Sequence, residues 1–500
     1  MDIDSAEDVF LRMPMNDSEI KFLAYNFYRD ENGEDQSVVD GISIGETLAS
    51  SLWQGFSSIA RHYQEFGLGG RRNETIVLPK DASALRIKVA SVFSTVSVTG
   101  SPIGQFQYDE EQWGFKNLPI VRLSRIFRIA QRPIRSSIQR KKILSIAGWT
   151  MRHDEINKKD VVVLFRKSLL NGASPILKRN FIQHGDKIFN SENNVHFSKQ
   201  TFVQTLERYG AEWDDLVIDL CVEFATNLYS EMRSNLVLCF ALYSDLLDNY
   251  RPKVCRVQAD FSPDWIIVYQ LCRKMGIRTE SYMDGYPIIP LCPISRDKSG
   301  KGWLVDDVVA FGRGHADLIS TMDFPCERIL LKEPPFRHLQ IENVKIFDFI
   351  IVSSFANCFS MYGDQLSPVA TMKAVLEVVT KVGAKSIGIK IKTIKERKYI
   401  EPLIKNLHIP VEILEGPFNS HVNKASAIIG GISTAIAEST IAGIPYFVFE
   451  PPEQGYTDEL INKAQVIKLE RIARTKHQLE NLIIKGQTSW TATLEDLSNI

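Results

Sequence analysis

A glycine turn between two apolar runs constrains the fold of this chain more than any other feature. The first run, Ala427–Ile429, stops at Gly430–Gly431, and the residues that follow, Ser433 and Thr434, are typical helix caps. The helix that they begin ends before a second apolar run, Tyr446–Phe449. This order predicts a strand, a glycine turn, a helix and a second strand, the unit from which parallel sheets are built.

The same segment offers the chemical groups that bind a nucleotide phosphate. A helix N-terminus behind a glycine turn presents free backbone N–H groups and a positive dipole end, and Ser433 and Thr434 add hydroxyl donors. Glu438 follows closely enough to accept hydrogen bonds from ribose hydroxyls. The alternative is an ordinary strand–helix–strand unit with a well-capped helix, since a short glycine motif occurs in both settings.

The motif Gly-Gly-x-Ser-Thr-x-x-x-Glu, followed by Ala-Gly-x-Pro and a strand, resembles the nucleotide-binding segment of GT-B glycosyltransferases. The resemblance in architecture covers residues 250–470. It implies that the turn at Gly431 and the hydroxyls of Ser433 and Thr434 meet the donor phosphate, and that Glu438 meets the ribose. UDP-sugar epimerases and CDP-polyol phosphotransferases share this motif. It therefore indicates a nucleotide-binding site but does not specify the reaction.

Short apolar runs alternate with helical periodicity from residue 143 onward. This alternation predicts an α/β chain with two Rossmann-like, doubly wound parallel sheets facing a central cleft, as in the GT-B fold. The predicted strands are 143–147, 161–164, 254–258, 279–282, 308–311, 347–353, 386–391, 411–414 and 446–449. The predicted helices are 199–209, 216–250 (one helix or two), 260–275, 369–382, 399–407, 469–474 and 478–485.

The charged, proline-containing segment 332–344 indicates a boundary between the two sheets. We therefore expect an N-terminal acceptor and catalytic domain over 1–340 with an irregular first portion. A C-terminal nucleotide-sugar-binding domain would cover 341–470. Helices in 471–500 would brace the first domain, as they often do in GT-B enzymes.

The first 140 residues carry weaker patterns. Apolar residues at helical spacing predict a helix over 46–66 that stops at the glycines 67–70. Residues 74–78 and 87–98 look like strands, although the pattern of the second also admits a helix. The pattern of this region indicates no role.

Composition excludes several classes of protein. With 500 residues, 44% of them hydrophobic and 24% charged, the chain can bury large cores in two or three domains. No stretch approaches the roughly 18 apolar residues of a membrane span, and the acidic N-terminus does not fit a signal peptide, so we expect a cytoplasmic protein. A net charge of −1 argues against a nucleic-acid binder.

The cysteines and histidines do not form a metal-binding pattern. The seven cysteines contain no CxxC pair, and most lie in apolar segments, so we expect buried free thiols rather than disulfides. The nine histidines form no HxxxH or HExxH pair, which argues against zinc. We expect no metal and no cofactor other than the nucleotide-sugar substrate.

Residues 122–142 form a basic segment, in which eight arginines and lysines interleave with apolar residues and no acidic residue intervenes. Such a surface suits anionic lipid headgroups or a phosphorylated, lipid-linked acceptor, which would place the protein peripherally at the inner membrane. The alternative is a solvated helix face whose arginines pair with acidic residues elsewhere.

Two carboxylates follow predicted strands of the first domain. Asp284 comes after the strand 279–282, at the edge of the sheet where ligands bind in doubly wound folds. There it can deprotonate an acceptor hydroxyl or attack the anomeric carbon, although Asp-Gly is also a common turn dipeptide. Asp260 closes the strand 254–258 on the same edge, as a second catalytic carboxylate or as the cap of the next helix.

The segment Tyr282–Gly285 resembles the Asp-Gly motif of transferases that use CMP-activated acidic sugars, namely sialic acids and Kdo. The retaining β-Kdo transferases of bacterial surface polysaccharide assembly are the most similar family, and the resemblance implies that Asp284 is the nucleophile. One feature departs from the pattern, because the sequence lacks the His-Pro pair that many of these enzymes carry. The corresponding strand ends in Lys390 and Lys392, whose charges can neutralise a phosphate or a sugar carboxylate.

Further candidates follow other strands. Gly416 and Pro417 resemble the loop that GT-B enzymes lay against the nucleobase, and Ser353 follows the first strand of the second domain, where a hydroxyl can meet a phosphate. Arg313 and His315 follow the strand 308–311 and can face the donor, although a lone histidine is more often a core or surface residue.

Together these features predict a cytoplasmic GT-B glycosyltransferase. It would move Kdo or a related acidic sugar from a CMP-linked donor to a bacterial surface glycan, such as an O-antigen, a capsule or a lipid-linked oligosaccharide. The alternatives are a UDP-sugar epimerase or a CDP-polyol phosphotransferase on the same fold, or a catalytically silent GT-B scaffold. The sequence leaves the acceptor, the linkage and the stereochemical outcome open.

Overall fold

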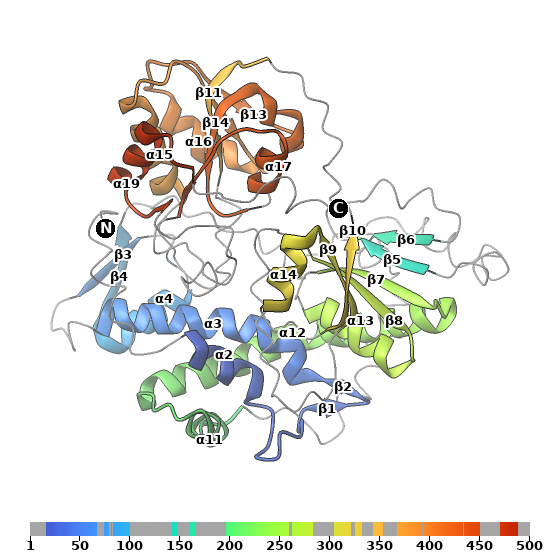
Figure 1. Ribbon diagram of the computed structural model, residues 1–500. Helices are drawn as coiled ribbons and strands as arrows, with labels where there is room; N and C mark the ends of the chain where they lie inside the picture. The colour runs from blue at the N-terminus through green and yellow to red at the C-terminus, as the bar shows by residue number, and fades with distance from the viewer. Residues whose placement is uncertain are drawn as a thin grey trace, which may run out of the picture.

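The structure is a computed structural model of the whole chain. Its described residues are 17–67, 75–79, 82, 84–100, 143–147, 161–165, 197–259, 263–283, 305–321, 326–332, 344–353, 368–392, 394–433, 435–450 and 471–488. Two six-stranded parallel sheets dominate these residues, one formed by strands up to Lys332 and the other by strands from Phe347 onward (Figure 1). The structure thus confirms the predicted α/β class with two doubly wound sheets.

The first sheet has the strand order β10-β9-β8-β7-β5-β6, and all its pairs are parallel. In chain order this is a 2-1-3-4-5-6 arrangement, one of the two common doubly wound orders with a strand added at the edge. Its strands are β5 (Ile143–Ala147), β6 (Val161–Phe165), β7 (Val254–Ala259), β8 (Arg278–Met283), β9 (Val305–Phe311) and β10 (Cys326–Lys332).

Helices that precede this sheet in the sequence and helices that lie between its strands complete the first unit. They are α2 (Asp17–Asn26), α3 (Ile44–Gly67), α4 (Ala84–Phe93), α11 (Lys199–Tyr209), α12 (Asp215–Tyr250), α13 (Pro263–Lys274) and α14 (Arg313–Thr321). Two small sheets accompany them, an antiparallel pair of β1 (Val38–Val39) with β2 (Ile42–Ser43) and a parallel pair of β3 (Ile76–Pro79) with β4 (Val96–Gly100).

One hydrophobic core joins these helices, because α3 packs against both α12 and α13. A buried glutamine fastens the same junction. The Ser43 amide donates to the side-chain oxygen of Gln270 at 2.5 Å, and the Gln270 side-chain amide donates back to the Ser43 carbonyl at 3.1 Å. The N-terminal helices are therefore part of the same core as the sheet.

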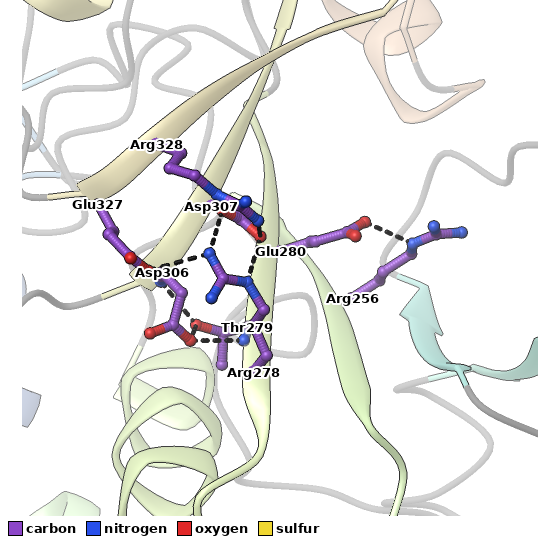
Figure 2. Close-up of polar contacts among 8 residues, drawn as sticks. All are labelled: Arg256, Arg278, Thr279, Glu280, Asp306, Asp307, Glu327 and Arg328. Carbon is purple, nitrogen blue, oxygen red and sulfur yellow. Dashed lines mark hydrogen bonds and ion pairs between the residues drawn. The ribbon is translucent and has the colours of Figure 1, made fainter.

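An ionic network ties the first sheet together towards the amino ends of its strands (Figure 2). Asp307, 1% exposed, accepts two hydrogen bonds from Arg278 at 2.7 and 2.8 Å and two from Arg328 at 2.8 and 3.0 Å. Because the three residues lie on β8, β9 and β10, the carboxylate links the edge strand to the interior of the sheet. Arg278 also contacts the exposed Glu327 at 2.9 Å.

The second sheet has the order β13-β12-β11-β14-β15-β16, again all parallel. This is the 3-2-1-4-5-6 order of Rossmann folds. Its strands are β11 (Phe347–Val352), β12 (Ile387–Lys390), β13 (Val411–Leu414), β14 (Ala425–Gly430), β15 (Tyr446–Phe449) and β16 (Ile472–Ala473). Its helices are α15 (Pro368–Lys381), α16 (Arg397–Ile404), α17 (Ala435–Ile441) and α19 (Lys476–Lys485), with the 3₁₀ turns η3 (Ile394–Glu396), η4 (Phe418–Ser420) and η5 (Val422–Lys424).

Alternate residues of the central strands face two separate cores. Ile351 and Ile429 pack with residues of α15, α16 and α19, whereas Ile350 and Ile428 pack with α17. Figure 1 shows α15 and α19 on one side of the sheet and α17 on the other. Strands buried on both faces explain why these segments are continuous apolar runs.

Several predictions of secondary structure need correction. Residues 87–98 are not one strand, because α4 ends at Phe93 and only Val96–Gly100 is extended. Residues 469–474 were expected to be helical, but Ile472–Ala473 form the short edge strand β16. The segment 216–250 lies within the single helix α12, which Asp214 caps by accepting from the Leu216 amide at 2.8 Å.

The structure describes the C-terminal tail up to residue 488. Helix α19 packs against α15, β15 and β16 of the second unit, and its Leu479 and Leu482 are part of that unit's core. Bracing of the first domain by helices in 471–500 stays a prediction. The predicted boundary near residue 340 and the basic segment 122–142 lie outside the described residues.

The five described cysteines, Cys221, Cys239, Cys255, Cys272 and Cys326, are free thiols, and all but Cys326 are buried. The described helices include none whose length and apolar character would let it span a bilayer.

Candidate functional site

The carboxyl ends of three neighbouring strands bring polar residues together in the second unit. Ser353 follows β11, Lys390 ends β12, and the glycine turn follows β14. Because β11 pairs with both other strands, these residues lie side by side, and the Ser353 amide donates to the Lys390 carbonyl at 2.9 Å. The chain reverses its winding direction between β11 and β14, which is where doubly wound sheets bind their ligands.

Lys390 is a buried cation, with 7% of its surface exposed. Its ammonium group donates to the carbonyl of Ile391. Burial lowers the pKa of Lys390, and the nearby carboxylates Glu396, Glu438 and Glu415 oppose that effect. An anionic ligand at this edge would therefore meet a positive charge with little competing water.

Glu396 organises the loop after β12. This fully buried residue of η3 accepts a hydrogen bond from the Ser353 hydroxyl and another from the Lys392 amide at 3.2 Å. The side chain of Lys392 is exposed. Since the Ser353 hydroxyl donates to Glu396, a phosphate would have to replace Glu396 as its acceptor or be held by other donors.

The glycine turn is held by a side chain of β15 and by the side chain of the residue that follows this strand. The Tyr446 hydroxyl donates to the Gly431 carbonyl at 2.8 Å, and the Glu450 carboxyl accepts from the Ile432 amide at 3.0 Å. Ser433, the next residue, accepts from the Ala435 amide at 3.3 Å and so caps α17. The motif therefore folds as the sequence predicts, with a turn that leads directly into a helix.

Glu438 lies in the first turn of α17 and interacts with Lys390. Burial raises the pKa of Glu438 to about 7, and the positive charge of Lys390 only partly offsets this. A carboxyl group that is half protonated near neutral pH can both donate and accept hydrogen bonds, which suits recognition of sugar hydroxyls.

Glu450 is the second carboxyl group of this edge with a perturbed pKa. It is 6% exposed, and burial raises its pKa to about 7 despite the hydrogen bond from Ile432 and the positive charge of Arg474. Burial also raises the pKa of Tyr446, so this phenol is protonated and acts as a donor. Perturbed groups that cluster at one edge of a sheet mark a candidate functional site.

The predicted base-contacting loop lies at the same edge of the sheet. Gly416 follows β13 with a positive φ of 82°, a conformation that favours glycine. Pro417 precedes η4, and its carbonyl accepts from the Ser420 hydroxyl at 2.7 Å. The His421 ring contacts the Glu415 carbonyl at 2.6 Å, so the loop is held by its own hydrogen bonds.

The two candidates on α14 differ in exposure. Arg313 is exposed at the start of the helix. His315 is fully buried, and burial lowers its pKa to about 3, so the ring is neutral. The structure thus buries His315, as in the core position that the sequence left open, and a contact of either residue with the donor stays a prediction.

Three predicted site residues, Asp260, Asp284 and Thr434, lie outside the described residues. Their strands are described: β7 and β8 pair in parallel up to Ala259 and Met283, one residue before each aspartate. The catalytic roles of the aspartates and the phosphate contact of Thr434 stay predictions. Across the described part of the chain, no three His, Cys, Asp or Glu side chains converge as a metal ion requires.

Sequence reasoning missed Glu396, Tyr446 and Glu450. A weak signal existed for Glu450, because it is an acidic residue directly after an apolar strand and before two prolines. Nothing local marks Glu396 or Tyr446, because their roles depend on contacts with residues 43 and 15 positions away in the sequence.

Comparison with known proteins gave structural similarity only. No protein-family model and no curated protein matches the chain. A UDP-GlcNAc 2-epimerase from Neisseria meningitidis, solved with bound UDP-GlcNAc, is 13% identical, with 72% of this chain and 94% of that chain covered and a TM-score of 0.39. MurG from Acinetobacter baumannii is 10% identical over 70% and 91% of the two chains, with a TM-score of 0.36.

HepE from Anabaena, solved with UDP and glucose, is 10% identical over 69% and 89% of the chains, with a TM-score of 0.34. Similarities this distant say nothing about the activity of this chain. The fold assignment rests on the strand order and the parallel pairing of the two sheets.

Proposed function

We propose that this chain is an enzyme that binds a nucleotide sugar at the carboxyl edge of its second sheet and transfers the sugar to an acceptor. One observation carries the proposal: beside the switch point of a Rossmann-ordered sheet, a buried lysine ends β12, and its charge interacts with a carboxyl group in the first turn of the helix that follows the glycine turn. This is the set of groups that a phosphate and a ribose require.

The roles follow from the chemistry of each group. Lys390 and the exposed Lys392 would neutralise phosphate charge, and the turn at Gly431 with Ser433 and Thr434 would supply donors to phosphate oxygens. Glu438 would bind the ribose hydroxyls. The backbone at 416–417 would contact the base.

Asp284 would supply the reactive carboxylate of the first domain, as nucleophile or base. For the donor we propose a CMP-linked acidic sugar such as CMP-Kdo, which the sequence around Asp284 suggests, and for the acceptor a bacterial surface glycan. Two of the similar solved structures hold UDP-GlcNAc or UDP, so the base is the part of this proposal that the first experiment must decide.

The first experiment is thermal unfolding of the protein with CMP, CDP, UDP or GDP. A ligand that binds only the folded state adds about 2.7 kcal/mol of stability at one hundred times its Kd, so a clear rise in Tm is expected with CMP. Lys390→Met should remove most of the rise, whereas Lys405→Met, at an exposed position after α16, should keep it. A rise in Tm with UDP alone would show that the donor is UDP-linked rather than CMP-linked. No rise in Tm with any of the four nucleotides would overturn the proposal.

The second experiment tests the reaction. Asp284→Ala should abolish transfer and change the nucleotide Kd by no more than a few-fold. Near-normal turnover by this variant would contradict the role of Asp284. Conversion of a UDP-sugar without any acceptor would instead identify an epimerase.

A further inference from the structure

Tyr446, the first residue of β15, and Glu450, the residue after this strand, hold opposite sides of the glycine turn. Tyr446 binds the carbonyl of Gly431, and four residues later Glu450 binds the amide of Ile432. Both side chains are buried, at 2% and 6% exposed. The peptide that joins Gly431 to Ile432 is therefore fixed by one donor and one acceptor, and its orientation depends on the neighbouring strand.

This arrangement explains why both turn residues are glycines. A Cβ atom at Gly430 would lie 2.4 Å from the Tyr446 hydroxyl and 3.0 Å from the Cβ of Val352. A Cβ atom at Gly431 would lie 2.8 Å from a carboxyl oxygen of Glu450. The space that side chains would need at the turn is occupied by the two residues that hold it.

Glu450 and an incoming phosphate would compete for the same backbone turn. The Ile432 amide belongs to the turn that would receive a phosphate, yet its hydrogen bond goes to a carboxyl group. Arg474, the cation near Glu450, donates to the backbone carbonyl of that residue at 2.9 Å. Two anions held close together in a buried place do not both stay ionised.

We propose that Glu450 is a positioning residue for the phosphate of the donor and that it binds a proton when the phosphate arrives. A protonated carboxyl group can keep the hydrogen bond from Ile432 on one oxygen while the other oxygen carries the proton. The turn then keeps its shape, and the repulsion between carboxylate and phosphate disappears. This inference rests on the proposed function, because the phosphate is that of the nucleotide.

The perturbed pKa of Glu450, about 7, gives the inference a measurable range of pH. Other titratable groups at this edge are Glu438, Lys390 and Tyr446. Each of them, and the ligand phosphate itself, is present in both wild type and a Glu450 variant. The charge of Glu450 adds to the effect of burial in raising the pKa of Tyr446, and burial alone keeps that phenol protonated over this range of pH. A difference in pH dependence between the two proteins therefore belongs to Glu450.

The experiment measures the Kd of the nucleotide that raises Tm most in the panel of CMP, CDP, UDP and GDP, by calorimetry between pH 6 and pH 8. If binding requires the protonated carboxyl group, a pKa of about 7 makes wild type lose about tenfold more affinity over this range than Glu450→Gln. The variant should equal wild type at pH 6 and bind about tenfold more tightly at pH 8. In buffers of different ionisation enthalpy, wild type should take up a proton that the variant does not.

Two further variants separate positioning from folding. Glu450→Ala removes the acceptor of the Ile432 amide and should weaken binding at every pH, with Glu450→Gln restoring it. Tyr446→Phe should weaken binding a few-fold and leave the pH dependence unchanged. Weaker binding by Glu450→Gln at all pH values, or equal proton uptake by both proteins, would overturn this inference while leaving the proposed function intact. Absence of binding by wild type would overturn both.

Discussion

Two buried carboxyl groups, Asp307 in the first unit and Glu450 in the second, have pKa values shifted in opposite directions. Burial favours the protonated form of each. At Asp307 the hydrogen bonds and charges of Arg278 and Arg328 outweigh burial and lower the pKa to about 2 (Figure 2). At Glu450 the hydrogen bond from the Ile432 amide and the charge of Arg474 do not outweigh burial, and the pKa rises to about 7.

The difference follows the direction of the strands. Asp307 lies towards the amino ends of the first sheet, where its two arginines make it a fixed anion that joins three strands. Glu450 follows β15 at the carboxyl edge of the second sheet, the edge where ligands bind in such folds. A carboxyl group with its charge fully compensated serves stability, and one that can still change its charge is available for function.

The largest effect is expected from Asp307→Asn. The variant leaves two arginines facing each other without their carboxylate, which should cost about 3 kcal/mol of folding free energy. Because the pKa of Asp307 is lowered in the folded state, its stabilisation exists above the unfolded pKa and is lost as pH falls through about 2. Thermal unfolding between pH 2 and 7 should therefore show a smaller acid sensitivity in the variant. Equal stability of the two proteins at pH 7 would contradict this.

A smaller effect of opposite sign is expected from Glu450→Gln in the absence of nucleotide. The pKa of Glu450 is raised in the folded state, so its contribution is fully present below the unfolded pKa and is lost as pH rises through about 7. At pH 8 the variant should be more stable than wild type by on the order of 2 kcal/mol, and at pH 4 the two should agree. Urea unfolding at both values measures this, and a variant that is less stable at pH 8 would refute the comparison.

The smallest effect is expected from Glu327→Gln, within the same network as Asp307. Glu327 is half exposed and contacts Arg278 at a single distance of 2.9 Å. Solvent screens such pairs, so the loss should be about 0.5 kcal/mol or less. The midpoints of urea unfolding at pH 7 measure the loss of stability in both variants. An equal loss in Glu327→Gln and Asp307→Asn would mean that burial does not distinguish the two carboxylates.

The sequence predicted the sheets well where apolar runs are bounded by turn residues. The strand Val411–Leu414 and the helix Lys199–Tyr209 have the predicted bounds, and the helix shows why: Ser198 caps its start and Gly210 ends it in the left-handed region. The prediction failed at 87–98 and 469–474, where short apolar segments fit both periodicities and tertiary pairing decides between them.

The candidate site was only half predictable. Lys390, Ser433 and Glu438 were found because they belong to a local motif or end a strand. Glu396 and Glu450 were missed because the burial of an acidic side chain depends on distant parts of the chain. For the same reason, sequence alone did not show that the Ser353 hydroxyl already has an acceptor.

The junction at Gln270 has a consequence for synthesis of the chain. Its partner, Ser43, precedes it by 227 residues, and two of the helices that pack against α3, namely α12 and α13, begin only at residues 215 and 263. At the roughly 5–20 residues per second of translation, the part of this junction at α2–α3 is synthesised on the order of 10–45 s before Gln270. The apolar surface of α3 that packs against α12 and α13 therefore stays uncovered by them until those helices have been made.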